Sequence, residues 1–321
     1  MKKGLIGLLV LALAMTFGLG AMAETTSDET VDCYAISVMA GGAAWGAFEK
    51  GFNLGCEELG WNAYYLAPQQ ANDSAEMVTM IETALNNGAD VIMCAFNDLN
   101  MFSEVIERCS QSGVPTVGLY QEAEGIDCWI GSDSAKMGSL MADAIVKVAG
   151  DNPINVLYLQ TTLTHQQQNI QYKAIADRLA EIAPDAVVLG QDECNSNNVT
   201  AASKLAALKL ANPAFNCCIN GDGNGTVGCA AFVEEQGLQG KFFSVGIDDS
   251  PEILRLIKEG SLSCTITQGF YDSGYTACYL ADKLLKGEEV EYYTPSENLI
   301  IFADDVDAYC EQYGIDLSSV V

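Results

Sequence analysis

Apolar runs of strand length alternate with segments of helical periodicity along most of the chain. The run 33–39 predicts a first strand, after which Phe48, Phe52 and Cys56 recur at helical spacing. A second strand is expected at 63–66, and the same alternation continues towards the C-terminus. Strands that alternate with helices are typical of parallel sheets covered on both faces, so the pattern predicts an α/β fold.

One strand–helix–strand unit occurs twice in the chain. The first copy, residues 89–121, contains ADVIMCAFND, MFSEVIERCSQSGV and PTVGLYQ, and the second, residues 214–249, contains AFNCCINGD, GTVGCAAFVEEQG and KFFSVGIDD. Aligning the copies places Asp98 opposite Asp222 and makes the strand ends Tyr120 and Asp248 coincide. Ligands of open α/β folds bind at the carboxyl ends of parallel strands. The duplication therefore predicts two similar halves that share one cleft.

The first 23 residues have the pattern of a secretory signal peptide. Met1, Lys2 and Lys3 form a positive start, residues 4–20 are uncharged and apolar, and the small-x-small site 21–23 predicts cleavage after Ala23. Removing 23 of the 321 residues leaves 298, which suffices for two domains. We expect an exported protein located in the periplasm.

Charge and cysteine content narrow the function classes. The net charge of −28 becomes −30 when Lys2 and Lys3 leave with the signal peptide, so binding to nucleic acid is disfavoured. The twelve cysteines include no CxxC pair, and His165 is the only histidine, which argues against a zinc site. We favour buried free thiols, with a disulfide framework as the alternative for an exported chain. No metal and no cofactor is expected.

The chain resembles the ribose- and galactose-type periplasmic sugar-binding proteins of bacterial ABC importers. The segments that carry the resemblance are WGAFEKGFNLGCEELGW, NNGADVIMC, SGVPTVGLY, IGSDSAKMGSLMADAI, SVGIDDSPEILRLIKEGSLSCTITQ and GYTACYLADKLLKGE. The resemblance implies two Rossmann-like lobes joined by a three-crossover hinge, with the ligand cleft between them. It implies an N-terminal lobe of residues 31–133 and 269–297 and a C-terminal lobe of residues 134–268 and 298–321.

The resemblance also implies ligand contacts. Asp248 stands where the family has an aspartate that accepts from sugar hydroxyls, Gln268 where it has an amide near the hinge, and Trp45 near a ring-stacking aromatic. The chain departs from the family at 120–121, where Tyr-Gln replaces Asp-Arg, and at 166–169, where amides replace an arginine. The full set of expected contacts is Trp45, Tyr120, Gln121, Gln168, Asn169, Asp222, Asp248 and Gln268.

These observations predict a monomeric, non-enzymatic receptor. Its ligand would be a small neutral sugar or polyol, because the expected pocket lacks arginine. Its partners would be an ABC permease and a chemoreceptor. One alternative is a receptor of the same fold for a nucleoside or a furanose quorum signal. Another is an exported glycoside hydrolase using Asp98 and Asp222, although no common catalytic motif is present.

Overall fold

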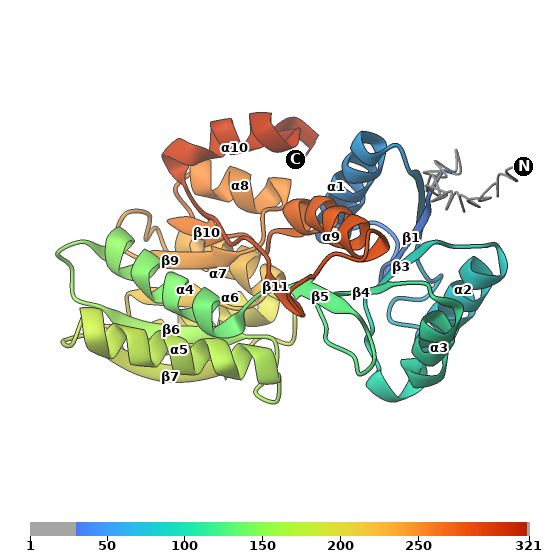
Figure 1. Cartoon of the computed structure of the whole chain (residues 1–321). Helices are drawn as coiled ribbons and strands as arrows, with labels where there is room; N and C mark the ends of the chain where they lie inside the picture. The colour runs from blue at the N-terminus through green and yellow to red at the C-terminus, as the bar shows by residue number, and fades with distance from the viewer. Residues whose placement is uncertain (1–29, 320–321) are drawn as a thin grey trace, which may run out of the picture. The chain divides into compact units, whose positions relative to one another are not determined.

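The computed structural model describes residues 30–319, which form two six-stranded sheets with helices packed on them (Figure 1). The first sheet contains β1 (Asp32–Ile36), β2 (Asn62–Leu66), β3 (Val91–Cys94), β4 (Thr116–Leu119), β5 (Cys128–Gly131) and β11 (Tyr293–Pro295). The second contains β6 (Asn155–Gln160), β7 (Val187–Glu193), β8 (Cys217–Asn220), β9 (Phe243–Ile247), β10 (Cys264–Ile266) and β12 (Ile300–Phe302). The predicted signal peptide, residues 1–23, lies outside the described residues.

The helices divide between the two sheets. With the first sheet are α1 (Ala43–Leu59), α2 (Ser74–Asn86), α3 (Leu99–Ser112) and α9 (Phe270–Leu285). With the second are α4 (Ser134–Ala149), α5 (Gln166–Ile182), α6 (Asn198–Ala211), α7 (Gly223–Glu235), α8 (Pro251–Lys258) and α10 (Val306–Tyr313). Two short 3-10 helices, η1 (Ala303–Asp305) and η2 (Leu317–Ser319), flank α10. In the described part of the chain no helix has the length and apolar character needed to span a bilayer.

The two sheets share one strand order. The first runs β11-β5-β4-β3-β1-β2 and the second runs β12-β10-β9-β8-β6-β7, so each strand of one has a counterpart in the other. Pairing is parallel throughout, except that β12 runs antiparallel to β10. The predicted α/β fold with two lobes of parallel sheet is confirmed. The chain passes between the sheets three times, from β5 to α4, from β10 to α9 and from β11 to β12.

The duplication is visible in how helices begin. Asp98 caps α3 by accepting from the Asn100 amide at 3.0 Å, and Asp222 caps α7 by accepting from the Gly225 amide at 2.8 Å. Both aspartates follow a buried strand, and each satisfies an amide that the helix itself leaves unpaired. The two residues that align in the sequence therefore perform the same local task in the two lobes.

Helices α1 and α9 lie side by side and pack at very short range (Figure 1). A Cβ at Gly51 would collide with the Tyr271 carbonyl oxygen, and one at Gly274 with the Phe48 carbonyl oxygen, so both positions require glycine. In the same contact the Cys56 and Cys278 sulfur atoms are 3.8 Å apart. All twelve cysteines are free thiols in the structure and eleven of them are buried, where they pack as small apolar side chains.

Candidate functional site

A cavity of about 380 Å³ lies at the carboxyl ends of the strands. Tyr120, Asp248 and Gln268 line it just after β4, β9 and β10, and Gly221 and Asp222 line it just after β8. The other lining residues are Trp45, Trp129, Ser132, Ser134, His165, Gln167, Gln168, Gln171, Gly223, Ile247 and Phe270. Residues of both sheets thus meet at one polar cavity, at the place where α/β folds bind ligands.

One wall of the cavity is aromatic and comes from the first lobe. The Tyr120 ring stacks on Phe270 with centroids 4.2 Å apart, and the Trp45 ring packs edge-on against both, at 6.0 and 5.4 Å. Trp129 adds a fourth ring, which stacks on Tyr293 at 4.1 Å. Trp45 is 8% exposed, so it is both a core residue and part of the cavity wall. Such a wall can cover the apolar face of a ring-shaped ligand.

The two aligned strand ends have the same unusual backbone. Tyr120 has φ 61° and Asp248 has φ 76°, although side chains other than glycine rarely adopt this region. Each amide donates to the neighbouring strand, from Tyr120 to the Ile130 oxygen at 2.7 Å and from Asp248 to the Ile266 oxygen at 3.0 Å. Strained conformations of this kind cluster at functional sites, where the surrounding structure holds them. Here they direct both side chains towards the cavity.

Asp248 is a half-buried carboxylate of the cavity. Gln268 donates its amide to Oδ1 at 2.6 Å, while Oδ2 faces the backbone of Gly223. Burial raises the pKa of Asp248 to about 6, the bond from Gln268 opposes this rise, and the neighbouring charges of Asp249 and Asp222 add to it. Gln268 thus fixes Oδ1, whereas within residues 30–319 no hydrogen bond to Oδ2 is formed.

Asp222 has its carboxylate occupied by the protein. In addition to capping α7, it accepts from Thr161 Oγ1 at 2.9 Å and from Ser196 Oγ at 2.6 Å. The Gln168 amide is occupied in the same way, because it accepts from the Thr161 amide at 2.9 Å and donates to the Gly221 carbonyl at 2.5 Å. Both residues line the cavity, and both also hold its second-lobe wall together.

Two of the expected contacts lie away from this cavity. Gln121 is exposed next to Tyr120, and it does not line the cavity. Asn169 donates to the Leu163 carbonyl at 3.0 Å and accepts from Gln160 at 3.1 Å, so its amide secures the loop before α5. The other six, Trp45, Tyr120, Gln168, Asp222, Asp248 and Gln268, come together in the cavity.

Several lining residues were not expected from the sequence. Trp129 lies inside a strand, where the sequence gives no signal of a cavity residue. Phe270 begins a helix, and its position two residues after Gln268 is the sequence signal that could have placed it near the cavity. Gln171 accepts from the Tyr158 hydroxyl at 2.6 Å. His165 caps α5 by accepting from the Gln168 amide at 3.4 Å, and it also reaches the cavity.

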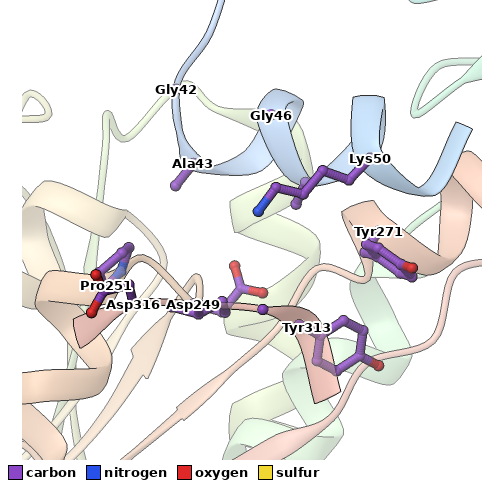
Figure 2. Close-up of a pocket in the computed structure, with 12 residues that line it drawn as sticks. Gly42, Ala43, Gly46, Lys50, Asp249, Pro251, Tyr271, Tyr313 and Asp316 are labelled. Carbon is purple, nitrogen blue, oxygen red and sulfur yellow. The ribbon is translucent and has the colours of Figure 1, made fainter. Parts of the chain in front are cut away.

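A second cavity, of about 310 Å³, lies between α1 and the C-terminal segment (Figure 2). The Lys50 side chain extends over it from α1, and Asp249, Tyr271 and Tyr313 line it on other sides. Asp249 accepts from the Tyr309 hydroxyl at 2.5 Å. A third cavity of about 500 Å³ shares Asp222, Gly223 and Asp248 with the first and Gly42, Ala43 and Asp249 with the second. The three cavities therefore adjoin one another through these shared residues.

The charges around the first cavity are one-sided. Its lining includes Asp222 and Asp248 but no lysine or arginine. Within residues 30–319 no group of three or more His, Cys, Asp and Glu side chains has the arrangement of a metal site. The site can thus accept hydrogen bonds from hydroxyl or amino groups, whereas it has no fixed cation to pair with a carboxylate or phosphate.

The paired sheets, the three crossings and a polar cavity at the strand ends define a two-lobed α/β binding protein. Residues 34–289 match the model of the periplasmic binding protein domain, and the chain belongs to this family. The resemblance found in the sequence is confirmed at this level. The family consists of binding proteins, and membership implies an extracytoplasmic location.

Relatives and solved structures agree with this assignment. The chain is 23% identical to the ribose import binding protein RbsB of Salmonella typhimurium over 301 residues, which cover 92% of this chain and 96% of the relative. It superposes with a TM-score of 0.79 on AraP, an arabinose-binding protein from Geobacillus stearothermophilus, at 18% identity, covering 88% of this chain and 99% of AraP. An Actinobacillus succinogenes solute-binding protein with bound D-allose gives a TM-score of 0.77 at 18% identity, covering 87% and 100%.

Proposed function

We propose that the protein is an extracytoplasmic receptor that binds one small neutral sugar or polyol in the first cavity and delivers it to an ABC permease. The observation that carries the proposal is the division of the cavity into an aromatic wall from one lobe and a carboxylate and amide wall from the other. A pyranose or furanose ring has one apolar face and a rim of hydroxyls, and both features find a matching wall.

Binding and lobe closure are coupled in this proposal. Trp45 and Tyr120 belong to the first lobe and Asp248 to the second, so a ligand that contacts all three gains its full affinity only when the lobes are close together. A ligand with better contacts in one arrangement shifts the population towards it. The closed form would be the one that the permease recognises, and a chemoreceptor could recognise the same form. We assign the lobes to residues 31–133 with 269–297 and 134–268 with 298–321.

Direct ligand contacts are proposed for Asp248 through Oδ2, for Gln268, and for the rings of Trp45 and Tyr120. Asp222 and Gln168 contribute through the cavity wall that they build, because their polar atoms are already bonded. Gln121, in the loop after β4, and Asn169, in the first turn of α5, would reach a ligand in this cavity only after a local rearrangement. The mature protein is proposed to begin at Glu24, after cleavage at Ala23, and to act as a monomer, which light scattering of the exported protein would test.

The proposal is tested by a thermal-shift screen of the mature protein against neutral monosaccharides, polyols, nucleosides and amino acids. A ligand that binds only the folded state raises the melting temperature, by an amount that grows with ligand concentration. We expect a clear shift with one or a few sugars or polyols and none with their carboxylated or phosphorylated forms. Stabilisation by sugar acids or sugar phosphates alone would contradict the proposal.

A nucleoside is the second candidate, because four rings line the cavity: Trp45, Tyr120, Trp129 and Phe270. Aromatic side chains stack on bases as well as on sugars. A hit only among nucleosides in the same screen would select this alternative. The glycoside hydrolase alternative relies on Asp98 and Asp222 as its catalytic pair. Asp98 does not line the cavity, and Asp222 is occupied in capping α7, so this pair is not brought together.

A further inference from the structure

Three hydroxyl groups surround the backbone carbonyl of Gln268, at the point where the chain crosses from β10 to α9. Ser296 Oγ lies 3.1 Å from this oxygen, Tyr120 OH 3.3 Å and Ser132 Oγ 3.4 Å. Ser132 Oγ and Ser296 Oγ are themselves 3.1 Å apart. Ser132 follows β5, and Ser296 follows β11, so one residue from each of the three crossings takes part.

The second crossing, from β10 to α9, and the third, from β11 to β12, are also in direct contact. The Thr267 amide donates to the Leu299 carbonyl at 2.9 Å, and the Leu299 amide donates to Thr267 Oγ1 at 3.0 Å. Gly269, with φ 67°, sits so close to the Glu297 carbonyl that a Cβ would collide with it. The backbone on both sides of Gln268 is therefore held against the segment that carries Ser296.

The side chain of Gln268 points the other way, into the cavity. Its amide donates to Asp248 Oδ1 at 2.6 Å, which leaves Oδ2 for a ligand. Ser296 is 3% exposed and does not line the cavity, so it has no direct access to a ligand. A fixed carbonyl orients the side chain of the same residue, because the backbone position sets where the amide can reach.

We infer that Ser296 is a positioning residue for the binding site: its hydroxyl fixes the Gln268 backbone, and through it the amide that orients Asp248. The inference has two consequences. Its effect on ligand affinity rests on the proposed function, since it requires Asp248 to contact the ligand. Its effect on the Gln268–Asp248 hydrogen bond can be measured without any ligand. The same crossing residues would transmit hinge movement to the carboxylate.

The test independent of ligand is an NMR titration of the Asp248 carboxyl in protein labelled with [13C]aspartate, with the signal assigned by its loss in Asp248→Asn. The bond from Gln268 lowers the pKa of Asp248, so weakening it should raise that pKa. Ser296→Ala is expected to shift the titration upward by roughly half a pH unit or more, and Ser296→Thr, which keeps a hydroxyl, by less. An unchanged midpoint in Ser296→Ala would overturn the inference.

The matched control is Ser261→Ala. Ser261 is also 3% exposed, and its hydroxyl donates to Glu234 at 2.6 Å, away from the crossings. This substitution also removes a buried, hydrogen-bonded hydroxyl and should destabilise the fold to a similar extent. It should leave the pKa of Asp248 unchanged. A shift as large as that of Ser296→Ala would reduce the effect to a general loss of stability, and the positioning role would be wrong.

The second arm is a double-mutant cycle on the affinity for D-ribose, D-allose and D-arabinose, measured by calorimetry. Ser296→Ala should weaken binding roughly fivefold to tenfold. In the Gln268→Ala background the same substitution should cause almost no further loss of affinity, because the amide through which Ser296 acts is absent. Full additivity would overturn the inference. If the wild-type protein binds none of these sugars, the proposed function loses support, while the titration still decides the role of Ser296.

Discussion

The carboxylate of Asp248 lies directly over the backbone of Gly223, where a Cβ at position 223 would stand 2.5 Å from Oδ2. Gly223 is the first residue of α7 and follows the capping residue Asp222. The absence of a side chain there makes room for Oδ2, the carboxylate oxygen that Gln268 does not bind. Glycine at this position is thus required by the Asp248 carboxylate rather than by the helix.

Replacing Gly223 by alanine should therefore weaken ligand binding. The new methyl group would displace the Asp248 carboxylate, which is the movable end of a side chain, so the fold should tolerate the change. We expect a loss of affinity of about tenfold or more with a melting temperature close to that of the wild type, measured by calorimetry and thermal unfolding. Unchanged affinity would mean that Oδ2 is not the ligand contact.

Asp248→Asn should reduce affinity more selectively than any truncation at this position. Asparagine keeps the shape and tolerates the positive φ, but its amide replaces an ionised acceptor for ligand hydroxyls. We expect a loss of about 10- to 100-fold in affinity, corresponding to a charge-assisted hydrogen bond. Asp151→Asn, an exposed change, serves as the control and should bind as the wild type does. Equal affinities for the two variants would remove Asp248 from the site.

The ligand-free Asp248→Asn variant should be more stable than the wild type at pH 8. The folded-state pKa of about 6 lies above the ordinary value of 3.8, so the folded protein holds a proton on Asp248 more tightly than the unfolded chain does. That contribution to stability is complete below pH 4 and is lost as the pH rises through 6. The wild-type carboxylate then costs up to about 3 kcal/mol, which asparagine avoids.

The check is the difference in unfolding free energy between the two proteins from pH 4 to pH 8, measured by denaturant titration. Other carboxyl groups titrate in both proteins and cancel in this difference. We expect the advantage of Asp248→Asn to grow between pH 4 and pH 7 and then to level off. A difference that stays constant across this range would show that Asp248 is not shifted.

Packing between α1 and α9 gives a prediction about stability alone. Gly51→Ala should destabilise the protein by about 2 kcal/mol or more, since the added Cβ meets the Tyr271 backbone, which cannot move aside easily. Gly46→Ala is the matched control on the same helix, where a Cβ meets nothing within 4 Å, and it should stabilise α1 by up to about 1 kcal/mol. Denaturant unfolding of both variants measures the difference, and similar values would contradict the close crossing.

Features that follow from local position along the chain are predictable from the sequence. Tyr120 and Asp248 end matched strands, and the alignment of the two copies is enough to predict that they occupy equivalent places. Asp98 and Asp222 also align, and both prove to be helix caps. Periodicity and position in the chain suffice for such features, because a residue that follows a parallel strand lies at the carboxyl edge of its own sheet.

Other features depend on contacts that the sequence does not encode locally. Asp73 and Glu76 have the spacing of a capping box at the start of α2. Asp73 accepts from the Glu76 amide, but the Glu76 carboxylate accepts from the Gln69 amide rather than from that of Asp73, so only half of the box forms. Asn169 is one residue from Gln168, yet the helix turns their amides to different partners. Ser296 reaches Gln268 only because two crossings, far apart in sequence, run against each other.

Strand β11 completes the first sheet although it comes from the last tenth of the chain, and α9 covers α1 from almost as far downstream. An exported polypeptide emerges with its N-terminus first, so the earlier part of this lobe must wait, with its sheet edge unpaired and the surface of α1 uncovered. The lobe whose first strands are synthesised earliest thus depends on residues near the C-terminus for its last strand and for α9. A stop anywhere before the end of β11, even one beyond the second lobe's central strands, would leave both lobes unfinished.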